Sequence, residues 1–227
     1  MKYGKTIVCF ANSRKTSGRC IAGKEWQHGA PGEWVRPVST RATHEISEEE
    51  RRYENGRDPQ LLDIVLVPCE IHQPLPHQRE NHVIASGYYW VPQGTLAWKE
   101  ISGWLDRPST LWGTGQGSYT GLNNRVVIGQ EDGSSLYLVA VERLRLLVGR
   151  KAPEYPDSKR AVRAEFSYRG TTYRMDVTDP AIERTYLGQV DGQYDIARPI
   201  LCVSLGDPYQ GYFYKLVAGV LYAERLK

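Results

Sequence analysis

Two stretches of the sequence follow the same plan, and this repetition decides the predicted fold. The first contains KTIVCFANS (5–13), GRCIAGKE (18–25) and EWVRPVS (33–39). The second contains LYLVAVERLRLLVG (136–149), AVRAEFSYRG (161–170) and TTYRMDVTD (171–179). Each segment is rich in apolar and β-branched residues and is separated from the next by turn-forming residues, which is the pattern of successive β-strands.

A helix signal and a fourth strand signal follow each stretch. The helix signals are HEISEEERR (44–52) and PAIERTYL (180–187), and the apolar runs are LDIVLVPCE (62–70) and PILCVSLG (199–206). Val38 and Leu66 are 28 positions apart, and Val177 and Val203 are 26 apart, so the spacing agrees as well. Strand-rich sequences resemble one another readily, so coincidence stays as the alternative to a duplication.

The order β-β-β-α-β-β is that of an OB-fold barrel. We therefore predict a mainly β protein with two OB-like barrels in tandem, over residues 1–93 and 134–227. The fifth strand of the first barrel is expected at residues 82–91. Residues 94–133 would form a connector of a short helix and a Gly-rich loop. The apolar stripe of that helix is expected to dock on a barrel and comprises Trp98, Ile101, Trp104 and Leu105.

Positive charge is concentrated on equivalent strands of the two halves. Residues 1–44 contain eight Lys/Arg against two Glu, a balance of +6, and residues 143–174 contain nine against three acids, again +6. The whole chain is only +3. Scattered charge usually forms a solvated surface. Concentration of one sign on matching strands favours a polyanionic partner, most simply a nucleic acid.

Composition indicates a globular protein with no membrane segment. The 227 residues are 41% hydrophobic and 24% charged, and the longest apolar run near the amino terminus is too short for a signal peptide. Four cysteines without a C-x-x-C pair favour buried thiols and a cytoplasmic location. The 15 Tyr and six Trp greatly outnumber the three Phe, which suits a protein that presents ring faces to a ligand.

The sequence offers little support for catalysis or for a cofactor. His72, His77 and His82 are five residues apart, a spacing that does not place imidazoles together on a strand or a helix, so a metal there is a weak hypothesis. Asp157 and Glu165 lack the lysine of a PD…(D/E)xK nuclease. The sequence therefore favours a binding protein without a cofactor over an enzyme acting on nucleic acid.

Aromatic rings interleaved with cations on the early strands are typical of OB surfaces that bind nucleic acid. We predict that Trp34 stacks on a base while Arg19 and Arg36 neutralise phosphates. The alternatives are a core tryptophan and a structural salt bridge of Arg36. The full set of predicted nucleic-acid-binding residues is Asn12, Arg14, Lys15, Arg19, Lys24, Trp34, Arg36, Ser39, Arg163, Tyr173, Arg174, Tyr212, Tyr214 and Lys215.

With these residues in view, the chain resembles the dual OB-containing domain family of bacterial proteins over nearly its whole length. The resemblance rests on Asn12-Ser13, GRCIAG (18–23), WVRPVS (34–39), ENH (80–82), VSLGDPY (203–209) and GYFYKLVA (211–218). It implies a paired-barrel fold, nucleic-acid or nucleotide recognition, and a place in prokaryotic defence systems with partner proteins. A nucleotide or small-molecule sensor is therefore the alternative to a protein that binds single-stranded DNA or RNA.

Overall fold

The computed structural model describes residues 2–155 and 157–226 and divides the chain into two compact units between Leu105 and Asp106. Each unit is built on one sheet. The division falls inside the segment 94–133 that was expected to be a connector. Residues 98–104 belong to the first unit, and residues 106–133 belong to the second.

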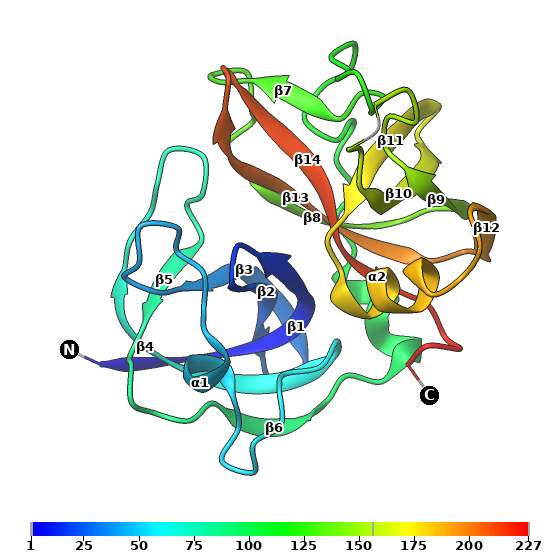
Figure 1. Cartoon of the computed structure of the whole chain (residues 1–227). Helices are drawn as coiled ribbons and strands as arrows, with labels where there is room; N and C mark the ends of the chain where they lie inside the picture. Colours follow the sequence, from blue (N-terminus) through cyan, green and yellow to red (C-terminus); the bar gives the residue numbers. More distant parts are fainter. Residues whose placement is uncertain (1, 156, 227) are drawn as a thin grey trace. The chain divides into compact units, whose positions relative to one another are not determined.

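The strands of the first unit close into a barrel (Figure 1). The sheet runs β1-β2-β3-β5-β4, and β4 pairs back onto β1. Strands β3 and β5 are parallel, and β6 continues the sheet beside β4. The elements are β1 (Tyr3–Lys15), β2 (Gly18–Gln27), β3 (Ala30–Val38), α1 (Glu48–Arg51), β4 (Asp63–His72), β5 (Asn81–Ile84), β6 (Val91–Thr95) and the 3-10 helix η1 (Trp98–Trp104).

Alternate side chains of these strands fill the barrel. Ile7, Ile21, Val65 and Val67 are fully buried in one apolar cluster, because side chains at every second position of a strand point to the same face. Helix α1 begins at Ser47, whose side chain accepts a hydrogen bond from the backbone N–H of Glu50 while the Glu50 carboxylate accepts one from the backbone N–H of Ser47. This reciprocal cap stabilises a helix of a single turn.

The second unit repeats the same topology with additions. Its sheet runs β12-β9-β10-β11-β14-β13-β8, and β11 and β14 are parallel, as are β3 and β5 in the first barrel. The elements are β7 (Arg125–Val127), β8 (Leu136–Ala140), β9 (Arg143–Arg150), β10 (Arg160–Tyr168), β11 (Thr171–Val177), α2 (Pro180–Leu187), β12 (Gly192–Ala197), β13 (Ile200–Tyr209) and β14 (Tyr212–Leu221).

Strands β8 and β9 correspond to one predicted strand, residues 136–148, interrupted at Val141 and Glu142. The β8 portion pairs with β13 and the β9 portion pairs with β10, so the bend between them lets one segment close both sides of the barrel. A sheet closes into a barrel when its first strand pairs with a neighbour on each side, as the β8–β9 segment does with β13 and β10.

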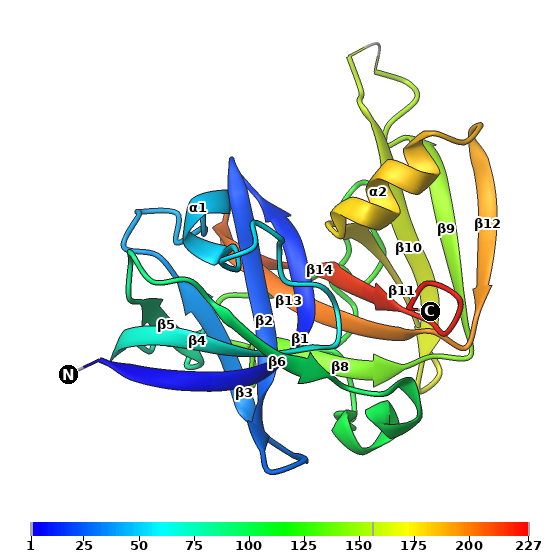
Figure 2. The same ribbon diagram turned by 90° about the horizontal axis from the view of Figure 1, so that it is seen from below.

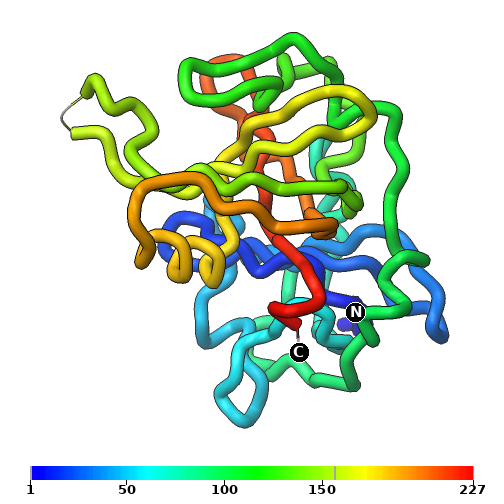
Figure 3. The backbone as a smooth tube through the Cα atoms, turned by 90° about the vertical axis from the view of Figure 1, so that its right-hand side faces the viewer, coloured from blue at the N-terminus to red at the C-terminus, as the bar shows by residue number. Residues whose placement is uncertain are grey.

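In the chain, helix α2 follows β11, the third strand of this barrel. In space it packs beside β10 and β9 (Figures 2 and 3). Asp179 Oδ1 accepts hydrogen bonds from Ala181 N at 3.1 Å and Ile182 N at 3.3 Å, and Pro180 occupies the first turn. Proline needs no hydrogen-bond acceptor at this position, and an aspartate before it caps the free N–H groups.

The predicted mainly β fold of two OB-like barrels is confirmed, with differences in detail. The strand expected at residues 82–91 is two strands, because β5 ends at Ile84 and the chain turns at Gly87, which has φ +87°. Strands β7 and β12 were not predicted, and β7 lies in the segment 94–133 that was expected to be a connector of a helix and a loop. Within the described part of the chain, no helix has the length and apolar character that crossing a membrane requires.

Candidate nucleic-acid interface

The outer face of β1, β2 and β3 is the surface on which Trp34 was predicted to stack a base. Val8, Lys24 and Trp34 lie side by side across these three strands. Lys24 is 6% exposed, and its Nζ donates a hydrogen bond to the backbone oxygen of Trp104 in η1 at 2.7 Å. The same Nζ lies 5.3 Å from the centre of the Trp34 ring. Lys24 therefore fastens η1 to the barrel, and its burial does not fit the predicted phosphate contact.

The rings on this face pack against one another in an aromatic cluster of Phe10, Trp26, Trp34 and Trp104. Phe10 contacts Trp34 edge to face at a centroid distance of 6.1 Å and lies 5.7 Å from Trp104. Trp26 stacks on Trp104 with centroids 5.8 Å apart and planes 9° from parallel. Trp34 is half-buried. The face that resembles a base-stacking platform in sequence is thus covered by a helix of the same chain.

Arg36 and Ser39 are buried as well. Arg36 is 3% exposed, and its guanidinium donates to Glu80 Oε1 at 3.0 Å and to Cys20 Sγ at 2.8 Å. Burial alone would lower the pKa of Arg36, but Cys20 and Glu80 together raise it. Ser39 is 2% exposed and donates to Glu45 O at 2.6 Å. Arg36 thus forms a buried ion pair with Glu80, and this burial does not fit the predicted phosphate contact.

The remaining predicted residues of the first barrel lie along the β1–β2 hairpin. Asn12 Nδ2 donates to Pro59 O at 2.9 Å. Arg14 is exposed and stands directly opposite Arg19, while Lys15 and Arg19 are half-buried. Like charges at directly opposed positions destabilise a strand pair. The hairpin tip therefore gathers three cationic side chains.

The three histidines considered for a metal are not gathered into a site. The rings of His72 and His82 stack with centroids 4.5 Å apart, and His82 Nδ1 is 2.7 Å from the hydroxyl of Tyr3. Burial, with contributions from His72 and Lys5, lowers the pKa of His82 to about 4. Among the residues that the structure describes, no group of three or more His, Cys, Asp or Glu side chains is placed to hold a metal ion.

Two predicted residues of the second barrel lie in its interior. Tyr173 is fully buried, and its hydroxyl accepts a hydrogen bond from Leu111 N at 3.2 Å. Lys215 is 1% exposed, and its Nζ donates to Gly113 O at 3.0 Å and lies 5.4 Å from the centre of the Tyr173 ring. Burial lowers the pKa of Lys215 to about 8. Both side chains hold the loop before β7 against the barrel, and the prediction that they contact nucleic acid does not fit their burial.

Tyr212 and Tyr214 occupy the opposite face of β14 and are half-buried. The Arg125 guanidinium lies 4.0 Å from the centre of the Tyr212 ring. Tyr214 packs against Tyr209, which is 62% exposed, at a centroid distance of 6.3 Å. These tyrosines form a partly exposed surface near the tip of the β13–β14 hairpin.

The outer side of β9, β10 and β11 carries four arginines, which we call the arginine face: Arg143, Arg145, Arg163 and Arg174. Their neighbours along each strand, such as Leu144, Leu146 and Ala164, are fully buried, so strand alternation turns the arginines outward. None of the four belongs to the fully buried set: Arg143 is exposed and the other three are half-buried. Residues 143–174 have a net charge of +6, and these four arginines bring part of that charge to one surface.

A row of alternating charge crosses this face in strict register. Asp195 on β12 stands opposite Arg145, Arg145 opposite Glu165, and Glu165 opposite Arg174. Glu165 is held closely by Arg174, at 2.6 Å and 3.0 Å, and more loosely by Arg145, at 3.4 Å. The carboxylate of Asp195 is 3.6 Å from both Arg143 and Arg145.

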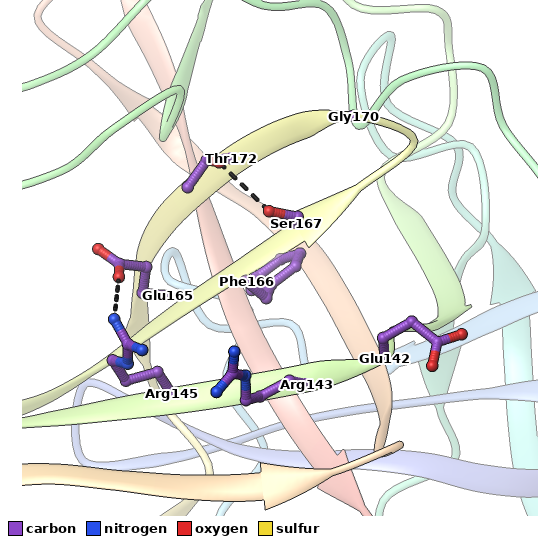
Figure 4. Close-up of a pocket in the computed structure, with 8 residues that line it drawn as sticks. All are labelled: Glu142, Arg143, Arg145, Glu165, Phe166, Ser167, Gly170 and Thr172. Carbon is purple, nitrogen blue, oxygen red and sulfur yellow. Dashed lines mark hydrogen bonds and ion pairs between the residues drawn. The ribbon is translucent and has the colours of Figure 1, made fainter.

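A pocket of about 550 Å³ opens on the arginine face (Figure 4). Arg143 and Arg145 reach it from β9, and Glu165 and Ser167 reach it from β10, while Ser167 Oγ lies 3.2 Å from Thr172 Oγ1. The complete lining is Glu142, Arg143, Arg145, Glu165, Phe166, Ser167, Gly170 and Thr172. The pocket combines guanidinium donors, carboxylate acceptors and hydroxyls, which suits a polar ligand with an anionic group.

Arg163 lies at the end of the arginine face where β9 leads into β10. Its Nη1 donates to Thr120 O at 3.1 Å, and burial, with the neighbouring charge of Arg174, lowers its pKa. Beside it, Tyr119 and Tyr155 meet edge to face at a centroid distance of 6.3 Å and are 75% and 59% exposed. Two exposed rings thus lie at one end of the arginine face, and the pocket lies at the other.

A family model matches residues 5–220, and its description is dual OB-containing domain. The chain belongs to the dual OB-containing domain family. The match spans both barrels, as the resemblance of the sequence implied. Comparisons with curated proteins and with solved structures give no match.

The candidate site of this dual OB-containing domain protein includes residues that were not predicted from the sequence. Arg143 and Arg145 were counted as charge but were not proposed as ligand-binding residues. Their alternation with Leu144 and Leu146 was the available signal, since it turns both arginines to one side of a strand. The exposed Tyr119 and Tyr155 carried no comparable signal, because each lies in a loop.

Proposed function

We propose that this member of the dual OB-containing domain family binds single-stranded nucleic acid and that the arginine face of the second barrel is its principal contact surface. The observation that carries the proposal is the common orientation of Arg143, Arg145, Arg163 and Arg174 on three adjacent strands. In an OB barrel the second and third strands and their loops form the surface on which oligonucleotides are bound.

The difference between the two barrels supports the choice of surface. In the first barrel the outer face of β1–β3 is covered by η1 and the aromatic cluster, and Lys24 and Arg36 are buried there. In the second barrel the outer face of β9–β11 has half-buried or exposed arginines throughout. A nucleic-acid backbone needs cations that can meet phosphate oxygens without unfolding the protein.

Exposed tyrosines supply the second component of a single-strand site. Tyr119 and Tyr155 offer ring faces at one end of the arginine face. Bases stack on such rings with little regard to their identity, and arginines follow the backbone. In the first barrel, Arg14, Lys15 and Arg19 on the β1–β2 hairpin are the cations we assign to a supporting contact.

A nucleotide sensor is the second candidate, and the pocket favours it. Its volume of about 550 Å³ is within the range of sites for small ligands, and its lining has both donors and acceptors. A sensor would bind a mononucleotide as tightly as an oligonucleotide, whereas a strand-binding protein would gain affinity with length.

Fluorescence anisotropy with labelled single- and double-stranded DNA and RNA, and with a labelled mononucleotide, tests the proposal. We expect tight binding of a single strand and a slope of log affinity against log salt of about −0.7 for each phosphate neutralised. Arg145→Gln should weaken binding and reduce the slope by about 0.7. Arg184→Gln removes the same charge from the exposed side of α2 and serves as the matched control. Length-independent binding with a shallow slope would favour the sensor, and no binding of any ligand would refute both.

We also propose, on the family resemblance and the cysteine content, a cytoplasmic protein that serves a prokaryotic defence system with partner proteins. The test is phage challenge of a bacterial host that produces the wild type, the Arg145→Gln variant or the Arg184→Gln variant. Protection by the wild type and the Arg184→Gln variant, and loss of protection by the Arg145→Gln variant, is the expected outcome. Equal protection by all three would separate any defence role from the arginine face.

A further inference from the structure

Strand β12 adds one acidic side chain to the edge of the arginine face. It pairs with β9 in the register that sets Asp195 opposite Arg145. In the first barrel the described residues between α1 and β4 contain no corresponding strand. The second barrel has therefore gained a carboxylate beside the two arginines of the pocket.

The Asp195 carboxylate makes two long contacts, one with each of two arginines. Its carboxylate is 3.6 Å from Arg143 Nη1 and 3.6 Å from Arg145 Nε. A charge-assisted N–H···O hydrogen bond is about 2.7–2.9 Å long. The closer pairs on the same sheet, such as Arg174 with Glu165 at 2.6 Å, show that the strands permit short contacts. Asp195 thus attracts two guanidiniums without engaging either at full strength.

Exposure makes these contacts easy to replace. The side chain of Asp195 is 50% exposed, and those of Arg143 and Arg145 are 64% and 37% exposed. Ion pairs between such exposed groups contribute little to stability, because water screens them and long side chains lose freedom in forming them. A ligand that offers more oxygens to both arginines would displace the carboxylate at small cost.

We propose that Arg143 and Arg145 form a phosphate subsite that the Asp195 carboxylate occupies in the free protein and that a nucleotide phosphate takes over on binding. A phosphate has several oxygens at tetrahedral angles and accepts paired N–H groups from two guanidiniums, whereas a single carboxylate at this distance meets each through one weak contact. The inference deepens the proposed function, on which it rests, by naming one phosphate position and the residue that competes for it.

Competition with Asp195 lowers the affinity of the subsite for every anion that enters it. With Asp195 in place, an anion that contacts the subsite alone gains little by entering it, because it must replace an existing charge partner. A phosphate diester within a strand, held also by the rest of the arginine face, gains enough to displace it. A free nucleotide also offers phosphate oxygens, so experiments must compare the two sources.

The central variant is Asp195→Asn, which keeps the size of the side chain and removes its charge. We expect it to bind a labelled single-stranded oligonucleotide about three- to tenfold more tightly than the wild type, since two weak exposed ion pairs no longer compete. Asp191→Asn is the matched control. Asp191 is four residues earlier, its side chain is 57% exposed, and it pairs instead with Arg160 at 2.8 Å. It should change affinity far less.

Arg143→Gln completes the set. It should weaken oligonucleotide binding about fivefold and should abolish most of the gain from Asp195→Asn when the two changes are combined, because the subsite then lacks one of its two guanidiniums. Thermal melting of each variant establishes that these exposed substitutions leave the fold intact. Additive effects of the two changes would show that Asp195 acts through general charge and would overturn the subsite.

A second probe separates the subsite from the proposed function. Titration of ¹⁵N-labelled wild type and Asp195→Asn with pyrophosphate, followed through the arginine Nε–H resonances, reports phosphate binding without a polymer. Oligonucleotide binding that is unaffected by Asp195→Asn would refute the subsite while leaving the proposed function in place. Pyrophosphate binding that Asp195→Asn strengthens, without oligonucleotide binding, would support the subsite and refute the strand-binding function. Failure of both probes would refute both.

Discussion

Lys24 and Trp104 are 80 positions apart in the sequence, yet the Lys24 ammonium donates a hydrogen bond of 2.7 Å to the backbone oxygen of Trp104. The bond joins β2 to the end of η1 inside the first unit. It also explains why a strand with the composition of a ligand surface is closed to ligands. The Lys24 side chain is buried, with its ammonium between the Trp104 carbonyl and the half-buried ring of Trp34, so its apolar stem is removed from water.

Trp104→Ala should destabilise the first barrel by about 3–5 kcal/mol, because it deletes a fully packed indole from the aromatic cluster. Trp98→Ala is the matched control, since Trp98 is in the same helix but is only half-buried. Urea unfolding of both variants measures the difference in the free energy of unfolding. Equal losses for the two variants would contradict the assigned packing of η1.

Arg36→Met should lower the free energy of unfolding by about 3–5 kcal/mol, because it leaves Glu80 buried without its guanidinium partner. Replacing both partners, as Arg36→Met with Glu80→Leu, should recover most of that loss, since two apolar groups need no charge partner. The salt dependence of oligonucleotide binding should be the same for the double variant and the wild type. A reduced salt slope in the folded double variant would restore Arg36 as a phosphate contact.

Stability should depend on pH through His82. Its pKa is lowered to about 4 in the folded protein, so between pH 6.5 and pH 4 the unfolded chain binds more protons than the folded one. The contribution of His82 to stability is therefore complete above pH 6.5 and is lost as the pH falls toward 4, by roughly 2–3 kcal/mol at pH 4.5.

The measurement is urea unfolding at pH 7.5 and pH 4.5 for wild type, His82→Gln and His28→Gln. The His82→Gln protein should lose less stability on acidification than wild type, because glutamine does not titrate. His28 is exposed, and its replacement controls for the loss of one imidazole at the surface. Identical pH dependence in all three proteins would show that His82 is not held neutral by its surroundings.

Tyr119→Ala should weaken single-strand binding by about 1–3 kcal/mol if one base stacks on its ring, with little change in salt slope because no charge is removed. The side chain is 75% exposed, so the melting temperature should stay close to that of wild type. Tyr88→Ala is the control, because Tyr88 is also exposed but lies in the first barrel. Wild-type affinity in the Tyr119→Ala variant would remove this ring from the interface.

The strand order, the helix starts and the paired-barrel plan could be predicted because each depends on residues close together in sequence. Asp179 and Pro180 define the start of α2 through contacts within one turn. The split between β5 and β6 was missed although Ser86-Gly87, a turn-forming dipeptide, separates the two strand-forming runs HVI (82–84) and YYWV (88–91). Strand β12 escaped prediction because only Tyr194 and Ile196 alternate with polar residues there.

The candidate site followed the sequence less closely. Charge counting pointed to equivalent strands of both halves, and Arg163 and Arg174, which were predicted to bind nucleic acid, are half-buried on the outer side of the second barrel. Lys24, Arg36, Tyr173 and Lys215 were named on the same grounds, but they are buried. Residue type alone cannot separate these groups, since long cationic side chains pack into interiors when a carbonyl or carboxylate meets them.

Arg36 and Arg174 show that the local sequence does not determine whether an outward-facing arginine is buried. Both follow a buried residue on the third strand of a barrel, and strand alternation alone turns both away from the core. The sequence by itself determined this alternation, and with it the two barrels. Only the tertiary structure decided that Glu80 and Cys20 enclose Arg36, while the side chain of Arg174 stays 38% exposed on the arginine face. The reason is that alternation fixes the side of a strand, whereas burial of that side depends on segments that are distant in the chain.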